Sequence, residues 1–248
     1  MPIEDPKARE ENVFNEEDPL VQLKLEILRR ALPARDAVVF GDIYGVDGAY
    51  TAKCVEYGCE RALLVDTHEN AAWLRLRLEH PSVDFYKGDF ADAFFMASVR
   101  ETFEVGVAFD VLLHQAPLLH TLHLMLEKVT GRFLVCQPML EEQPVPNTVV
   151  YLPGNTDTRL HPYPELPDDY RVLDVGQVNQ SHWIWGMTPS FLRSALAGEG
   201  FEVVFEAARE DLPPNERWSW RGYVAERRAG DRAHWSDHAR TLDLRDSP

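Results

Sequence analysis

Two glycines and an acid follow the first strongly apolar run of the sequence, where they could hold a ligand. Asp42 lies at the end of this run, and Gly45 and Gly48 lie in the loop after it. Glycine lets the backbone approach a ligand, and the N–H groups at the start of the expected helix favour an anion such as a carboxylate. Asp42 could accept a hydrogen bond from a ligand ammonium or a bridging water. Tyr44 stands in the tightest part of the turn, so the stretch also fits an ordinary strand-to-helix turn.

The next two expected strands also end in acids. Asp66 ends the second strand, followed by Thr67, at close to the roughly 20 residues that separate a glycine loop from a ribose-binding acid. A carboxylate there can accept both ribose hydroxyls and rejects a 2′-phosphate. At the end of the third strand, Asp89 could accept from an adenine amino group and Phe90 offers an apolar edge to the ring. Acids at three successive strand ends predict a nucleoside-binding site.

Three histidines are candidates for a general base, because imidazole titrates near neutral pH. His114, with Gln115 beside it, follows the apolar run of the expected fourth strand. His120 begins the next expected helix, and His182 lies in a proline-rich region further on. His120 could instead be structural, capping its helix or bonded within the core.

Alternating strand and helix patterns are expected to position these residues. Helices are expected over 18–32, 47–58, 69–80, 92–103, 118–129 and 188–200. Strands are expected over 37–43, 61–67, 83–89, 109–115, 131–140, 201–209 and 218–227. Continuous apolar strands that alternate with helices predict an α/β fold, with a doubly wound, mostly parallel, Rossmann-like sheet covered by helices on both faces.

The chain is expected to consist of an N-terminal arm with a helix, a main domain with a proline-rich insertion, and a C-terminal tail. Residues 1–35 are expected to form an arm and a helix, and 36–228 the main domain. Within that domain, the proline-rich region 141–187 is expected to be an irregular insertion that acts as a lid, because long loops in compact domains are usually functional or disordered. Residues 229–248 are expected to form a loosely held tail.

Charge and composition limit the kinds of partner that the protein is expected to bind. The net charge is −16, which repels phosphate backbones, so nucleic acid is a disfavoured partner. The three cysteines form no C-x-x-C pair, and no metal site is predicted. The sequence contains neither a membrane-spanning apolar run nor an apolar signal segment at its start, so a cytoplasmic protein is expected.

The order of these motifs resembles that of class I S-adenosylmethionine-dependent methyltransferases over residues 36–140. The resemblance rests on D-I-x-x-x-D-G at 42–48, the strand ends "LLVD" and "GDF", and the segments "FDVLLHQAPLLH" and "TGRFLVCQPML". Within that class, "FDVLLHQAPLLH" and "HWIWGMTPSFLRSAL" are similar to the tRNA wobble-uridine methyltransferase-like group. Trp185 matches that group's Trp-x-Pro element, whereas Met187 stands where proline is usual.

The resemblance implies S-adenosyl-L-methionine as cofactor and a role for each motif. Asp42, Gly45 and Gly48 would line its methionine part. Asp66 would hold the ribose, and Asp89 with Phe90 the adenine. The transferable methyl group would lie beside His114 and Gln115, while His120 matches the family's histidine by register.

The sequence therefore predicts an S-adenosylmethionine-dependent methyltransferase that methylates a small-molecule acceptor on oxygen. One alternative is a tRNA wobble-base modifying enzyme, which the net charge opposes. Another is a non-catalytic protein that binds the cofactor or a partner, because the family's usual D-x-G-x-G-x-G keeps only its last glycine in register here. Tyr44 could close the pocket or face the sulfonium. The oligomeric state is open, with a homodimer among the possibilities.

Overall fold

Seven strands form one sheet through the described part of the chain. The computed structural model describes residues 14–42, 47–67, 71–151, 185–212 and 218–229. The strand order is β3-β2-β1-β4-β5-β9-β8; the first five are parallel, and β9 is antiparallel to both neighbours. Their bounds are β1 (Asp36–Phe40), β2 (Arg61–Asp66), β3 (Val83–Lys87), β4 (Phe103–Phe109), β5 (Val129–Leu140), β8 (Phe201–Arg209) and β9 (Trp218–Arg227). The predicted mostly parallel α/β sheet is confirmed.

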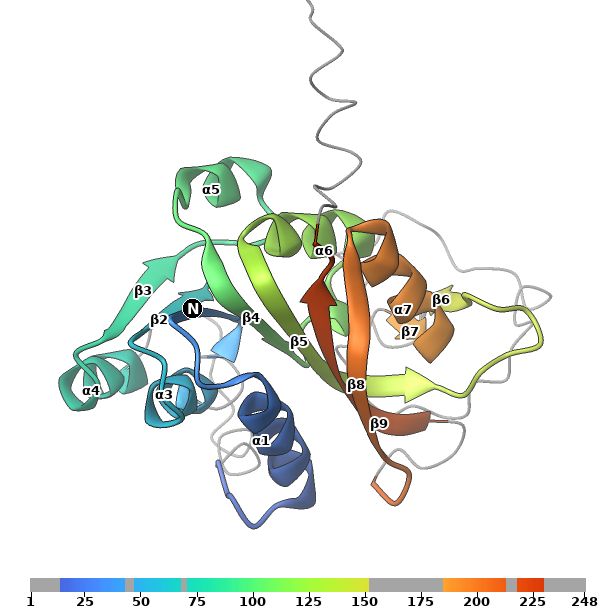
Figure 1. Ribbon diagram of the computed structural model, residues 1–248, viewed down its shortest axis with the longest axis horizontal. Coiled ribbons are helices and arrows are strands. Elements are labelled where there is room, and N and C mark those ends of the chain that lie inside the picture. Colours follow the sequence, from blue (N-terminus) through green and yellow to red (C-terminus); the bar gives the residue numbers. More distant parts are fainter. Residues whose placement is uncertain (1–13, 43–46, 68–70, 152–184, 213–217, 230–248) are drawn as a thin grey trace, which may run out of the picture.

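Helices cover both faces of this sheet (Figure 1). On one face lie α1 (Pro19–Ala31), α3 (Ala49–Glu56) and α4 (Ala71–Glu79), whose apolar residues share a core with the sheet. On the other lie α5 (Ala93–Ser98), α6 (Leu118–Glu127) and α7 (Pro189–Gly198), around a second core. This three-layer arrangement is what continuous apolar strands require, because both faces of each central strand must be buried.

Two helix starts agree with their sequence signals. Asp18 caps α1 by accepting hydrogen bonds from the backbone N–H groups of Leu20 and Val21. Thr188 caps α7 in the same way by accepting from Phe191 N–H. Proline occupies the first turn of both helices, where its missing N–H costs nothing.

The fourth strand lies earlier than expected. The sequence predicts a strand over 109–115 and a helix over 92–103, but β4 spans Phe103–Phe109 and α5 ends at Ser98. The strand was missed because Gly106 interrupts its run of apolar residues. A Cβ at this position would lie 2.4 Å from a methyl group of Val129 on β5, so the close packing of these two strands requires glycine. Asp110, with a φ of 57°, ends the strand, and Leu112–His114 forms a 3₁₀ turn, η1.

The region expected to be an irregular insertion contains short strands. β6 (Val149–Tyr151) pairs antiparallel with β7 (Trp185–Met187), and together they form a second, two-stranded sheet. Residues 152–184, which hold most of the expected lid, lie outside the described residues. Among the described helices, none is long and apolar enough to cross a membrane.

Candidate functional site

The strand order reverses direction between β1 and β4. β2 and β3 follow β1 on one side, while β4 and β5 lie on the other. All five strands are parallel, so their carboxyl ends meet at one edge of the sheet. Open α/β sheets bind ligands at such a switch point, because the flanking loops turn to opposite faces and leave a crevice between them. Asp42 follows β1 here, and Asp110 follows β4.

Asp42 is buried at this point and holds the start of α3. It is 5% exposed, and its carboxylate accepts hydrogen bonds from Thr51 N–H (2.7 Å) and from Thr51 Oγ1 (2.6 Å). A longer bond comes from Tyr50 N–H (3.4 Å). Burial raises the pKa of Asp42 to about 6 although these hydrogen bonds lower it. Asp42 therefore orients α3 toward the crevice, a positioning role beyond the ligand contact that the sequence predicts.

The described part of the glycine loop has left-handed backbone. Gly48 has a φ of 82°, stands at the N-cap of α3, and its N–H donates to Asp42 O at 3.2 Å. Gly48 has no side chain to cap the helix, and the Asp42 carboxylate does so instead by accepting from the Tyr50 and Thr51 N–H groups. Tyr44 and Gly45 lie outside the described residues, and their predicted roles stay predictions.

Gly41 is a site residue that the sequence reasoning missed. Its φ is 76°, and a Cβ there would lie 3.1 Å from Val111 Cγ2 and 3.7 Å from the ring of Phe90. Phe90 is itself 6% exposed, with its ring centroid 5.9 Å from that of Phe40. The glycine thus lets two apolar side chains close over the end of β1. Its signal in the sequence was a glycine between the apolar run and Asp42.

The two remaining acids differ in exposure. Asp66 ends β2 and is 2% exposed, close enough to Asp42 to contribute to raising the pKa of that carboxyl. Thr67, next along the chain, is exposed. Asp89 is also exposed, and its carboxylate accepts a hydrogen bond from Ala91 N–H at 2.8 Å. Asp66 therefore lies in the crevice with Asp42, whereas Asp89 lies at its outer rim.

The candidate histidines differ in position and in exposure. His114 ends η1, directly after the β4 end, and is half-buried with Gln115 beside it. His120 lies on the exposed side of α6. That position disagrees with a core role for His120. His182 lies outside the described residues.

The end of the expected insertion reaches the loop that carries His114. The indole Nε1–H of Trp185 donates to the backbone oxygen of Gln115 at 2.8 Å, and Tyr151 packs edge-on against Trp185 with ring centroids 5.5 Å apart. Trp185 thereby joins β7 to the carboxyl end of β4. Sequence reasoning quoted this tryptophan for its family match but did not predict the contact.

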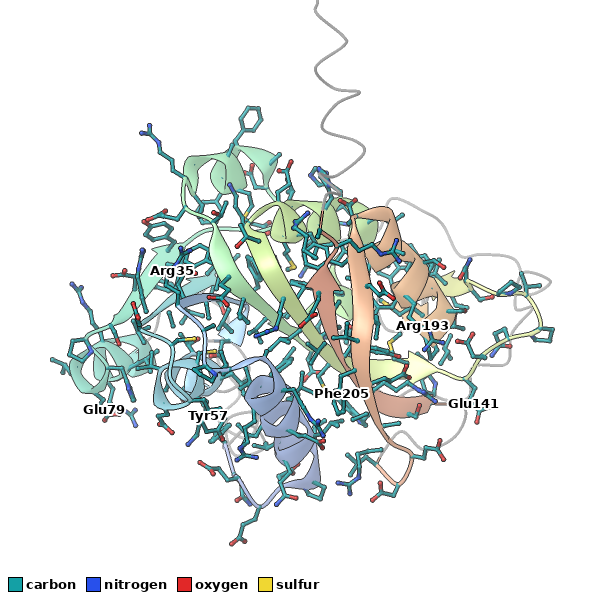
Figure 2. All side chains as sticks on the ribbon, in the orientation of Figure 1. Arg35, Tyr57, Glu79, Glu141, Arg193 and Phe205 are labelled. Atoms are coloured by element: carbon teal, nitrogen blue, oxygen red, sulfur yellow. The ribbon has the colours of Figure 1, made fainter. Side chains whose placement is uncertain are left out.

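The chain entering and leaving the insertion is held by an ion-pair network. Arg193 of α7 donates to Glu206 (2.7 Å) and to Glu142 (3.1 Å), and Arg221 donates to Glu206 at 2.7 Å. Figure 2 marks Arg193 on the side of the molecule where α7, β6 and β7 lie. The network ties the segment after β5, at the start of the insertion, to α7 and to β8 and β9.

A buried ion pair, also missed from the sequence, lies at the switch point. Lys24 of α1 donates through Nζ to the carboxylate of Asp110, and Lys24 is only 6% exposed. Burial by itself lowers the pKa of Lys24, but Asp110, together with Tyr50 and Cys136, raises it above its usual value. The signal in the sequence was a lysine on the apolar side of α1, where its neighbours at helical spacing are Val21, Ile27 and Leu28.

A separate surface groove of about 300 Å³ lies between α3 and α4. Figure 2 marks Glu79, one of its lining residues, at the end of α4. Its lining includes four acids, Glu16, Asp47, Glu56 and Glu79, and Lys53 is already paired with Glu16 and Glu56. This acidic lining disfavours a phosphate or carboxylate ligand, so the strand ends remain the better candidate site.

Comparison with known proteins relates the chain to others by fold. No protein-family model matches it, and no curated protein is similar to it in sequence. An O-methyltransferase family protein from Burkholderia thailandensis matches with a TM-score of 0.54 at 16% identity, over 86% of this chain and 57% of that one. This chain therefore spans less than two thirds of that protein.

Two further solved structures cover more of their own length. The 1,6-didemethyltoxoflavin-N1-methyltransferase of Burkholderia thailandensis, with 1,6-didemethyltoxoflavin and S-adenosylhomocysteine bound, has a TM-score of 0.53 at 17% identity, covering 84% of this chain and 81% of that one. The [4+2]-cyclase SpnF has a TM-score of 0.57 at 10% identity, covering 84% and 80%.

These matches define the class of fold. The chain has the Rossmann-like fold of class I S-adenosylmethionine-dependent methyltransferases, as the sequence predicts. Identities this low concern the fold alone, and the match to a cyclase means that the activity has to be argued from the site. The finer resemblance to the tRNA wobble-uridine methyltransferase-like group stays a prediction.

Proposed function

We propose that the protein is an S-adenosylmethionine-dependent methyltransferase that acts on the oxygen of a small-molecule acceptor. The observation that carries the proposal is the pairing of two buried acids, Asp42 and Asp66, at the switch point of this fold. A protein with the same fold binds S-adenosylhomocysteine. A carboxylate has several acceptor sites and can take a hydroxyl donor in addition to a partner within the chain, so Asp66 at this crevice favours a ligand with hydroxyl donors.

The residues present fit the adenosine half of the cofactor. Asp66 is the acceptor for the ribose hydroxyls, because it ends β2 and is buried. Phe90 and Gly41 give an apolar surface at the end of β1 on which an adenine ring can lie. Asp89 accepts from the adenine amino group at the rim, with the carboxylate capacity that Ala91 N–H leaves over.

The start of α3 fits the amino-acid half. Gly48 brings the backbone close without a Cβ, and Asp42 holds the start of the helix in place by accepting from the Tyr50 and Thr51 N–H groups. Tyr44 and Gly45 complete this loop in the proposal. The helix dipole at such a helix start favours a carboxylate.

On the acceptor side, the protein's part is to position a nucleophile and take its proton. When bound, S-adenosylmethionine supplies an electrophilic methyl group at its sulfonium. His114 holds the acceptor hydroxyl and accepts its proton, because it is half-buried directly after β4. Trp185 holds the backbone of Gln115. The described ends of the region 141–187 lie together, with Tyr151 packed against Trp185, which supports the proposal that this region contributes to the acceptor pocket.

A small-molecule acceptor is favoured over RNA by the charge of the chain. The net charge is −16, and tRNA binding relies on clustered Lys and Arg. Half-buried arginines are also paired with acids, such as Arg209 with Asp211 and Arg132 with Glu226. A tRNA-modifying enzyme and a non-catalytic cofactor-binding protein are the alternatives that the test below separates.

The test is calorimetric titration with S-adenosylhomocysteine. We expect the wild type to bind and Asp66→Asn to bind about 10–150-fold more weakly, since charged hydrogen bonds contribute about 1.5–3 kcal/mol each. Asp84→Asn is the matched control: this exposed acid of β3 pairs with Arg61 near the opposite edge of the sheet and should leave binding unchanged. A wild type that binds no S-adenosylhomocysteine ends the proposal. Binding without methyl transfer to any hydroxyl acceptor favours the non-catalytic alternative.

A further inference from the structure

Gln137 is a polar side chain within the apolar core on the α6 and α7 side of the sheet. It lies on β5 and is 0% exposed. Its neighbours at alternate positions of the strand, Val135 and Met139, belong to that core. A buried carboxamide is costly unless it is hydrogen-bonded, so the partners of Gln137 indicate whether its role is structural.

The carboxamide of Gln137 has weak partners among the described residues. Its Nε2 donates to the thioether sulfurs of Met187 at 3.0 Å and of Met139 at 3.5 Å, and a thioether is a weak acceptor. Its Oε1 is buried without a hydrogen-bond partner in the part of the chain that the structure describes. Arg221, directly opposite on β9, donates instead to Glu206 of β8 at 2.7 Å. The core therefore leaves one strong acceptor atom unfilled.

Gln137 lies just beyond the carboxyl end of β4. The last register pair of β4 and β5 is Phe109 with Cys136, and β5 continues to Leu140. Gln137 is thus the first residue of β5 past the end of β4, where the chain of β4 turns into η1 and reaches His114. The carboxamide therefore lies at the edge of the sheet that holds the proposed acceptor side of the site.

Two side chains of β7 face the core that contains Gln137. β7 lies against both β5 and η1. Side chains two residues apart on a strand share a face, and Trp185 and Met187 both pack in this core. Gly186 between them faces the opposite way, where a Cβ would lie 2.8 Å from the ring of Trp218. β7 therefore presents one aromatic and one thioether side chain to the same region.

These two side chains link Gln137 to the loop of the proposed base. Trp185 donates to the backbone oxygen of Gln115, which follows His114. Met187 contacts the carboxamide of Gln137. Positions two residues apart on a strand are separated by roughly 7 Å, so the two contacts lie about one substituted aromatic ring apart.

We propose that Gln137 selects the acceptor, because its Oε1 accepts a hydrogen bond from a second hydroxyl of a phenol whose first hydroxyl is held by His114. The inference rests on the proposed function and names the acceptor class, a phenol with a hydrogen-bond donor at the far end of its ring. The ring lies against Trp185 and the thioethers of Met139 and Met187, since sulfur makes favourable contacts with aromatic rings. Methionine side chains are flexible, so Met187 moves off the carboxamide to admit the ring.

The test compares two phenols of nearly the same shape. 4-Hydroxybenzyl alcohol carries a second hydroxyl, and 4-ethylphenol has a methyl group in its place. We expect the kcat/KM of the wild type to favour 4-hydroxybenzyl alcohol by about 10–100-fold, because 4-ethylphenol leaves the buried oxygen of Gln137 unpaired. Gln137→Met keeps the size of the side chain and should bring this ratio close to 1. Calorimetric titration of each phenol in the presence of S-adenosylhomocysteine should give the same ratio without turnover.

A matched control and melting curves identify a purely structural role. Gln22→Met makes the same substitution on the exposed side of α1 and should leave the ratio unchanged. If Gln137→Met raises the melting temperature and keeps the wild-type ratio, the carboxamide has no part in recognition and the inference is overturned. A wild type that binds S-adenosylhomocysteine but accepts neither phenol, or both equally, overturns the inference while the proposed cofactor site stands. A wild type that binds no S-adenosylhomocysteine overturns both.

Discussion

At the scale of single residues, the site is built from acids whose environments differ. Asp42 and Asp66 are buried at neighbouring strand ends, while Asp89 is exposed at the rim. The carboxylate of Asp42 accepts its hydrogen bonds from Thr51 of α3. Asp66 is therefore the buried acid better suited to bind a ribose. The same residue type therefore positions a helix at one strand end and is proposed to bind a ligand at the next.

Asp42 should make stability depend on pH. Burial raises its pKa from 3.8 to about 6, so the folded protein holds this proton more tightly than the unfolded chain. The protonated form stabilises the fold, fully below about pH 4, and this contribution is lost as the pH rises through 6. Ionisation then costs on the order of 3 kcal/mol.

Asp42→Asn removes that titration while it keeps an oxygen to accept from Thr51. We expect the free energies of unfolding of variant and wild type to agree near pH 4, and the variant to be more stable by up to roughly 3 kcal/mol at pH 7. Urea unfolding at both pH values measures this. A constant difference between the two proteins would show that Asp42 titrates normally.

Alanine substitutions at His114 and His120 should affect turnover differently. Replacing a general base by alanine lowers turnover about 10²–10⁴-fold, and we expect this for His114→Ala with cofactor affinity nearly unchanged. His120→Ala serves as the internal control, because this side chain is exposed on α6. Steady-state turnover and cofactor titration on both variants measure the effect. Full activity in His114→Ala would leave His182 or proximity alone to account for the reaction.

At the scale of elements, glycines decide how closely helices approach the sheet. α1 crosses β9 at Gly222, where a Cβ would lie 1.8 Å from Ile27 Cδ1 and 2.8 Å from Ile27 Cγ1. This close approach is what brings Lys24 of the same helix down to the strand ends. By contrast, Gly198 near the end of α7 has no atom within 4 Å of such a Cβ.

The same substitution should therefore have opposite signs at these two glycines. Gly222→Ala is expected to lower the free energy of unfolding by about 1–3 kcal/mol through overpacking, and Ile27→Val should recover part of that loss. Gly198→Ala should raise stability by about 0.5–1 kcal/mol, since glycine is the poorer helix former. Thermal or urea unfolding gives both signs. Equal effects at both sites would contradict the close packing of α1.

At the scale of the whole molecule, charge governs which partners approach. With a net charge of −16, the protein should bind tRNA weakly and without the steep salt dependence of several phosphate contacts. Filter binding at about 50 and 200 mM salt measures this, with a basic RNA-binding protein as positive control. Tight binding that falls about 10³-fold or more over this range would instead favour the tRNA-modifying alternative.

The sequence by itself determined the layered α/β fold and the acids at the strand ends. Apolar periodicity and helix caps such as Asp18 and Thr188 act over a few residues, so they can be read locally. The start of β4 was missed because Gly106 breaks the apolar run, although its neighbours bury the strand on both faces.

Only the tertiary structure decided which distant groups meet at the switch point. Lys24 and Asp110 are 86 residues apart in the chain, and Trp185 and Gln115 are 70 apart, yet each pair forms a hydrogen bond. These contacts depend on how closely α1 packs on β9 and on where β7 lies. Side-chain packing between elements sets both positions, and a local pattern of residues does not predict this packing.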